Sequence, residues 1–443
     1  MPVAQSHVAV RRDLIERMGD ARRRSDELFR VVKPSSLYER PIPERHRIIF
    51  YVGHLEAFDW NLLHGSLPDL TAFHPEFDRL FAFGIDPVGG GLPSDQPSDW
   101  PSLDHVREYV GKVRRALDEK LESGNLDGSH GGRDGFSLET LFNVAIEHRL
   151  MHVETLAYML HQLPLTQKIW QESPEARVTA PVEPRMVDVP QGRAILGLRR
   201  DSRSFGWDNE FEAHAVEVPA FAIDRFEVTN RQYLDFINAG GYEERALWSD
   251  QDWQWKSERG ITHPAFWKKT DEGWFFRGMF EERPLPLDWP VYVSHAEAMA
   301  FARGQDKDLP TEEEWHRAAY AGNGMDRSYP WGDRTPEPEL GNFDFVSWDP
   351  VSVNAHPAGE SAYGVQDMLG NGWEWTSSKF APFRGFEPFP FYRGYSADFF
   401  DGEHFILKGG SARTASCMLR ASFRNWFQPH YQYVYAGFRC VSR

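Results

Sequence analysis

The chain has 443 residues, and its net charge of −17 argues against a nucleic-acid surface or an anionic membrane as a partner. This length favours two domains, and 32 Phe, 16 Trp and 15 Tyr residues supply enough apolar surface for two cores. The two cysteines cannot form a disulfide framework, and no apolar segment resembles a signal peptide or a membrane span, so we expect a cytoplasmic protein.

The first 165 residues are predicted to form a four-helix bundle. Apolar residues recur at helical spacing in four segments, 8–32, 44–63, 103–121 and 137–163. Ser137 is a suitable N-cap for the fourth helix, and Pro164 follows its end. Four helices with one long crossover are typical of bundles that hold metal sites between facing helices.

Two histidines in the fourth predicted helix, His148 and His152, are four residues apart. Residues at this spacing share one helix face, so both imidazoles could reach the same ion. His54, in the second predicted helix, is the candidate third ligand. Histidines on a helix are more often surface or satisfied core residues, and the spacing alone leaves both interpretations open.

The second part of the chain has a different composition. Residues 166–190 are rich in proline and are predicted to be a linker, and residues 191–443 are predicted to form a loop-rich α+β domain. Helices are expected at 229–237, with Thr229 as N-cap, and at 311–319, with a Thr311–Glu314 capping box. The runs GNGWEW at 370–375 and GFR at 437–439 are its most distinctive motifs.

These residues resemble known families. Residues 1–165 resemble the DinB-like four-helix bundles, with the three histidines at matching positions. The second domain resembles the formylglycine-generating-enzyme-like, C-type-lectin-like fold, through the two motifs above and the runs 224–230 and 309–315. Domains of these kinds in this order resemble the non-haem iron sulfoxide synthases of ergothioneine biosynthesis.

The resemblance implies a chemistry and a cofactor. His54, His148 and His152 would hold Fe(II), O2 would be the co-substrate, and hercynine (trimethylhistidine) would be joined to a chalcogen donor. Zinc could occupy the same ligands but could not activate O2. The resemblance implies small-molecule partners, and we expect a monomer or a small homo-oligomer.

Further site residues follow from the same resemblance. Tyr392 is expected to donate a proton and Tyr395 to contact substrate. Asn425 and Trp426 match hercynine-contacting positions, and aromatic faces are suited to its permanent cation. The remaining expected substrate-binding residues, at positions where the family commonly has polar or charged ones, are Met151, Phe427 and Tyr431.

These departures bear on the chalcogen donor. The family commonly has Gln at the position of Met151, and arginines that bind a donor carboxylate in the region matching 80–93, which has none here. A donor without a carboxylate suits such a pocket, so the sequence most resembles the selenoneine synthases, which join hercynine to the selenosugar 1-seleno-β-D-glucose. The alternatives are a C–S bond with cysteine or γ-glutamylcysteine, and a DinB-type metal-dependent thiol transferase or non-catalytic metal-binding module.

Overall fold

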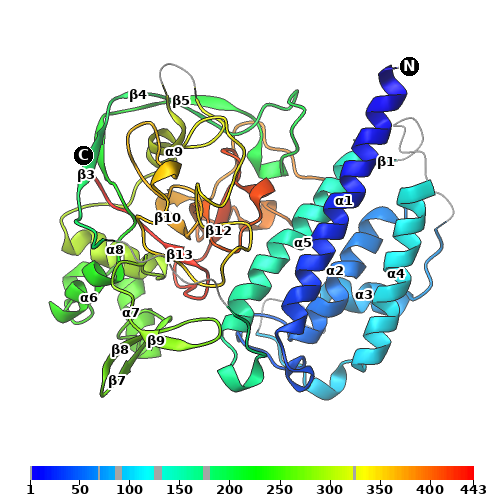
Figure 1. The fold of residues 1–443 in the computed structure, drawn as a ribbon, viewed down its shortest axis with the longest axis horizontal. Coiled ribbons are helices and arrows are strands. Elements are labelled where there is room, and N and C mark those ends of the chain that lie inside the picture. Colours follow the sequence, from blue (N-terminus) through cyan, green and yellow to red (C-terminus); the bar gives the residue numbers. More distant parts are fainter. Residues whose placement is uncertain (1, 68–69, 85–91, 124–131, 173–179, 323–325) are drawn as a thin grey trace. The chain divides into compact units, whose positions relative to one another are not determined.

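The computed structural model describes residues 2–67, 70–84, 92–123, 132–172, 180–322 and 326–443 (Figure 1). The chain divides into two units, residues 1–171 and 172–443. The predicted linker, 166–190, includes this division, and its residues 173–179 lie outside the described part. The first unit is helical and the second mixes short strands with helices, which confirms the predicted fold class. Among the described residues no helix combines the length and the apolar character needed to cross a membrane.

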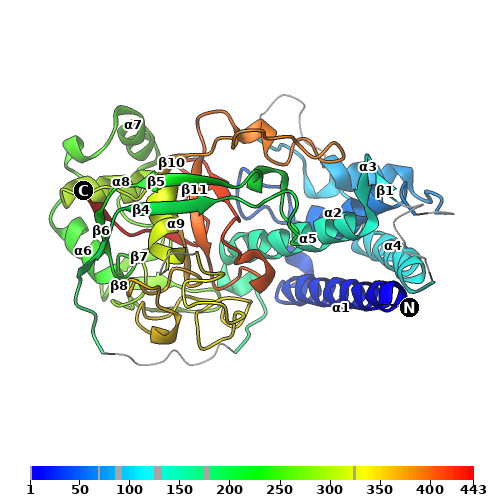
Figure 2. The same ribbon diagram turned by 90° about the horizontal axis from the view of Figure 1, so that it is seen from above.

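The described part of the first unit contains four long α-helices and one short α-helix. The long helices pack in a ring, because α1 contacts both α4 and α5, and α2 contacts the same two (Figures 1 and 2). The helices are α1 (Pro2–Arg30), α2 (Ile48–Leu63), α3 (Pro75–Phe83), α4 (Leu103–Ser123) and α5 (Leu138–His161). The strands β1 (Gly132–Arg133) and β2 (Phe136–Ser137) form a hairpin before α5.

The sequence predicted the four long helices, with the end of α2 at Leu63 and the start of α4 at Leu103, but it did not predict all of their ends or the short helix. Helix α1 begins at Pro2 rather than at residue 8, and α2 begins at Ile48 rather than at residue 44, after an extended Arg47. Ser137 is the N-cap of α5, as predicted, and its side chain accepts a hydrogen bond of 3.1 Å from Thr140 N. Helix α3 was missed because nine residues give too short a periodic pattern.

A cluster of buried charges joins α2 to α5. Arg149 of α5 is fully buried, and its Nη2 contacts both the Glu56 carboxylate and Asp59 Oδ2, the latter at 2.6 Å. Burial alone would raise the pKa of Glu56, but the charges of Arg149 and Arg114 outweigh it and lower that pKa to about 2. The two helices therefore meet through charges that have no water to replace a lost partner.

Short strands in several small sheets form the framework of the second unit. The largest sheet has the order β12-β11-β10-β13, with β10 and β13 parallel and the other pairs antiparallel. Its strands are β10 (Gly372–Lys379), β11 (Phe405–Gly410), β12 (Asn425–Phe427) and β13 (Ala436–Gly437). A three-stranded sheet, β14-β6-β3, contains β3 (Met186–Val189), β6 (Phe221–Asp224) and β14 (Val441–Ser442). The other strands are β4 (Gly192–Leu196) paired with β5 (His214–Val218), and β7 (Trp267–Thr270), β8 (Gly273–Arg277) and β9 (Glu282–Pro284) in one meander.

The described helices of the second unit include two that the sequence predicted. Helix α6 (Asn230–Asn238) begins after Thr229, and α9 (Glu312–Tyr320) begins with the predicted Thr311–Glu314 capping box. Helices α7 (Asp250–Arg259) and α8 (His295–Gly304) were not predicted, although serine N-caps precede both. The aromatic residues of α7 and the alanines of α8 give no clear amphipathic stripe.

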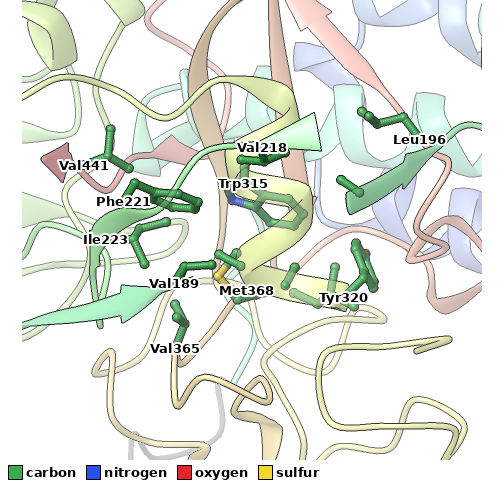
Figure 3. Packing of buried hydrophobic residues seen from close by; sticks show 14 of the residues in the cluster. Val189, Leu196, Val218, Phe221, Ile223, Trp315, Tyr320, Val365, Met368 and Val441 are labelled. Carbon is green, nitrogen blue, oxygen red and sulfur yellow. The ribbon is translucent and has the colours of Figure 1, made fainter. Parts of the chain in front are cut away.

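The core of this unit surrounds Trp315 of α9, against which residues of β5, β6 and a central loop pack (Figure 3). The indole Nε1 donates to Glu374 Oε2 at 2.9 Å, and the same carboxylate receives Arg439 Nε at 2.6 Å. Trp373 and Trp375 are also buried. The 370–375 and 437–439 motifs therefore contribute to the core.

The Arg149 cluster yields a stability prediction. Replacing Arg149 with Met leaves Glu56 and Asp59 buried without their main counter-charge, so we expect unfolding to become easier by about 3–5 kcal/mol. Denaturant unfolding followed by far-UV circular dichroism measures the change. The control is Arg23→Met, which removes exposed ion pairs on α1 and should change stability by about 0.5 kcal/mol or less. Equal effects of the two substitutions would contradict the role given to burial.

Candidate functional site

The three predicted histidines come together between α2 and α5. Helix α2 provides His54, and His148 and His152 lie one turn apart on α5, with one ligand nitrogen of each within 4.8 Å of the others. The ring centroids of His148 and His152 are 4.5 Å apart, and the ring of His54 lies 5.3 Å from that of His148 and 4.8 Å from that of His152. Such a group could hold a metal ion.

A backbone carbonyl near the end of α3 determines which ring nitrogen of His54 carries the proton. Its Nδ1 lies 2.7 Å from the carbonyl oxygen of Phe81, which can only accept, so Nδ1 carries the proton. The lone pair is then on Nε2, which lies 3.3 Å from His152 Nε2. A second ring nitrogen held by a backbone carbonyl is the usual arrangement of metal-binding histidines.

Burial keeps all three imidazoles neutral near pH 7. It lowers the pKa of His54 to about 4, with the nearby charges of His46 and Arg149 acting in the same direction. Burial and the mutual proximity of the rings lower the pKa values of His148 and His152 well below their usual range. Neutral imidazoles offer the lone pairs that a metal ion needs.

Aromatic side chains hold the imidazole rings in place. Phe58 stacks on His148 with centroids 3.4 Å apart, and Phe50 stacks on His54 at 4.7 Å. Tyr51 lies 5.7 Å from the ring of His152. These aromatic contacts limit rotation of the imidazole rings. The predicted substrate-binding residue Met151 precedes His152 on α5 and is half-buried.

Two more predicted site residues, Trp426 and Tyr395, lie together in the second unit. Trp426, on β12, stacks on Phe380 with centroids 4.1 Å apart, and the ring of Tyr395 meets its edge at 5.4 Å. Asn425 precedes it and accepts a hydrogen bond of 2.9 Å from Trp426 N through its own side chain. Part of the Trp426 surface is thus occupied by other aromatic rings.

Tyr392 and Tyr395 belong to one loop, and their rings are 5.6 Å apart. Tyr395 is buried, whereas Tyr392 is half-buried. Removal from water, aided by the negative charge of Asp208, raises the pKa of Tyr392 to about 12. The Tyr392 phenol therefore keeps its proton at neutral pH.

Phe427 and Tyr431, two further predicted site residues, pack against each other. Their rings stack at 5.1 Å with an angle of 5° between them. His430, next to Tyr431, stacks on Trp255 of α7 at 4.5 Å and contacts Asp252 at 2.8 Å. The loop that follows β12 is thereby attached to α7.

The region matching 80–93 is described only in part, because residues 85–91 lie outside the described part. Two arginines approach its described end, and both contact the carboxylate of Asp95. Arg40 also donates to Pro93 O at 2.7 Å, and Arg47 Nε lies 2.8 Å from Asp95 Oδ2. These guanidinium groups already have a carboxylate partner within the bundle.

Sequence reasoning missed several groups around these residues. The Phe81 carbonyl belongs to the missed helix α3, and Phe58 carries no signal beyond its position four residues after His54. Asp208 contacts the loop of Tyr392 from about 180 residues away in the sequence, and no periodic pattern indicates such a contact.

Comparisons with known proteins agree with this two-part architecture. Residues 17–156 match the DinB superfamily, and residues 171–443 match the sulfatase-modifying factor enzyme 1-like domain. The hercynine oxygenase of Mycolicibacterium smegmatis is 35% identical over 399 residues, which cover 88% of each chain. That of Mycobacterium tuberculosis is 37% identical over 337 residues, covering 75% of this chain and 76% of that protein. Ergothioneine biosynthesis protein 1 of Schizosaccharomyces pombe is 29% identical over 459 residues, covering 93% of this chain and 54% of that protein.

Identity above 30% across more than two thirds of two such proteins, together with both domain matches, settles the family. With a DinB-superfamily domain followed by a sulfatase-modifying factor enzyme 1-like domain, this chain belongs to the family of the hercynine oxygenases.

Proposed function

We propose that this protein is a hercynine oxygenase that uses Fe(II) and O2 to join a chalcogen atom to the imidazole ring of hercynine. The observation that carries the proposal is the group of three neutral imidazoles from α2 and α5, with ligand nitrogens within 4.8 Å of one another. The similarity to hercynine oxygenases over 88% of the chain supports the substrate.

The residues present fit an iron ion. His54, His148 and His152 would hold it through neutral nitrogen atoms, and three protein ligands would leave coordination positions for substrates. Bound iron would supply the one-electron chemistry with O2 that zinc lacks. The chain's own contribution is orientation, since the Phe81 carbonyl and the stacked Phe58 fix the direction of two of the three rings.

With a thiol donor the overall reaction balances simply. The ring C–H bond and the S–H bond break, a C–S bond and an S=O bond form, and one O2 molecule yields the sulfoxide oxygen and one water. Aromatic side chains suit the trimethylammonium group of hercynine, and Trp426, Phe427 and Tyr431 are the candidates. Asn425 can hydrogen-bond the carboxylate or the imidazole, and Met151 would border the substrate beside His152.

Tyr392 is the candidate proton donor and Tyr395 a candidate substrate contact. A phenol with a pKa of about 12 holds its proton until a strongly basic oxygen forms beside it.

For the donor, the similar proteins favour a thiol such as cysteine or γ-glutamylcysteine, because ergothioneine is hercynine that carries sulfur on its ring. A selenosugar is a second candidate, favoured by specific residues. Arg40 and Arg47, which approach the described end of the region 80–93, are engaged by Asp95. A carboxylate donor needs a cation, whereas a neutral sugar does not.

The metal ligands can be tested by substitution. We expect His54→Ala, His148→Ala and His152→Ala each to lower iron content and to abolish hercynine-dependent O2 uptake, because two imidazoles hold the ion weakly. Elemental analysis and an oxygen electrode measure both effects. His105→Ala, an exposed histidine of α4, is the control and should behave as wild type. Wild-type protein that holds zinc and consumes no O2 with hercynine and any donor would favour a metal-dependent thiol transferase or a non-catalytic module.

Tyr392 has its own test. We expect Tyr392→Phe to lower kcat by about 10²-fold or more, the usual contribution of a positioned proton donor, while iron content stays at the wild-type level. The matched control is Tyr363→Phe, which removes a half-buried hydroxyl elsewhere in the same unit. Wild-type kcat in Tyr392→Phe would assign proton donation to another group.

Donor competition separates the two candidate donors. Purified enzyme receives hercynine with equal concentrations of γ-glutamylcysteine, cysteine and 1-seleno-β-D-glucose under O2, and mass spectrometry quantifies the products. If the natural donor is a thiol, the sulfoxide is the main product. Where an arginine binds the donor carboxylate, we expect the thiols to be preferred over the selenosugar by about tenfold or more. A preference of that size for the selenosugar would establish the second candidate instead.

A further inference from the structure

A buried segment, Trp207 to Glu210, contacts the loop that carries Tyr392 and Tyr395. Asp208, which is 1% exposed, accepts two hydrogen bonds from that loop. Its Oδ2 lies 3.4 Å from Phe389 N, and its Oδ1 receives the Ser396 hydroxyl. The two donors lie on either side of both tyrosines in the sequence, so one carboxylate holds both ends of the tyrosine segment.

The neighbours of Asp208 reinforce this attachment. Trp207 stacks on Tyr395 with centroids 4.0 Å apart, and its ring lies 6.4 Å from that of Tyr392. Asn209 donates through Nδ2 to the Ser396 hydroxyl at 3.4 Å. Within the loop, Tyr392 N and Tyr395 N each donate to a carbonyl three residues earlier, at 3.0 and 3.1 Å.

The other end of the segment is bound to the chain just before β12. Glu210 receives Arg420 Nε at 2.8 Å and the Ser422 hydroxyl at 2.6 Å. The carbonyl of Asn209 accepts from Arg424 Nη1 at 3.3 Å, and Asn425 follows directly. The same four residues therefore connect the tyrosine loop to the strand that contains Asn425 and Trp426.

A packing role alone does not explain a carboxylate here. Burial raises the pKa of Asp208 to about 6, so its charge at neutral pH is costly even with the hydrogen bonds from Ser396 and Phe389. An apolar residue of similar volume would fill the space at lower cost, but it could not accept from two points of one loop.

We propose that Asp208 is a positioning residue, whose two hydrogen bonds to Phe389 N and the Ser396 hydroxyl set the place of Tyr392 for the reaction. The inference rests on the proposed function for its catalytic consequence, although the ordering of the loop is independent of it. Displacement of a reacting group by about 1 Å lowers a rate by about 10²-fold, so a small shift of the loop suffices.

The test is Asp208→Asn, which keeps the shape but places an amide donor where one acceptor stood. We expect hydrogen exchange at the amides of Tyr392 and Tyr395 to speed up by about tenfold, and kcat to fall by about 10–100-fold with iron content unchanged. Asp201→Asn, an exposed aspartate of the same unit paired with Arg199, is the matched control and should change neither quantity.

A double variant distinguishes positioning from general loosening of the fold. If Asp208 acts through Tyr392, Asp208→Asn combined with Tyr392→Phe has a kcat within about twofold of Tyr392→Phe alone. Two outcomes would overturn the inference. One is a double variant whose loss of kcat is the product of the losses in the two single variants, and the other is an Asp208→Asn variant with wild-type hydrogen exchange and wild-type kcat. If Asp208→Asn does not fold, Ser396→Ala is the substitute, because it removes one of the two hydrogen bonds. It should raise the exchange rates and lower kcat in the same way, but by smaller factors.

The two proposals can fail separately. Wild-type protein without hercynine-dependent O2 uptake would refute the proposed function, whereas the exchange rates would still decide whether Asp208 orders the loop.

Discussion

The ion contact between Arg149 and the two carboxylates Glu56 and Asp59 is the constraint on which the candidate metal site depends. These charges are buried, so each requires the others, and α2 and α5 can satisfy them in only one register. His54 lies on the same helix as the carboxylates, and His148 directly precedes the arginine. A helix register fixed by charge thus brings ligand nitrogens from two helices to within 4.8 Å of one another.

Buried carboxylates perform a related task in the second unit, where strands are short and backbone ladders are few. Glu374 joins Trp315 of the core to Arg439 near the end of the chain, and Glu210 receives Arg420 and Ser422. Each of these links spans a long stretch of sequence. A loop-rich fold obtains from such side chains the rigidity that longer sheets obtain from main-chain hydrogen bonds.

A feature could be predicted from the sequence when the residues that determine it lie close together in the chain. The long helices and the Thr311 capping box are set by neighbours a few residues apart, and their patterns are legible in the chain. The spacing of His148 and His152 is local too, whereas the tautomer of His54 depends on a carbonyl 27 residues away. Asp208 has no local signature, because its partners are more than 180 residues distant.

The long-range contacts of Glu210 also bear on how the protein is made. Its arginine partner is separated from it by 210 residues, so on the ribosome this buried carboxylate stays without that partner until Arg420 has emerged. The segment that holds the tyrosine loop and the strand with Asn425 can therefore close only after residues 420–425 have been made. A message that stops before the codon for Arg420 would encode His54, His148 and His152 of the first unit, joined to a second unit that lacks the partners of Glu210.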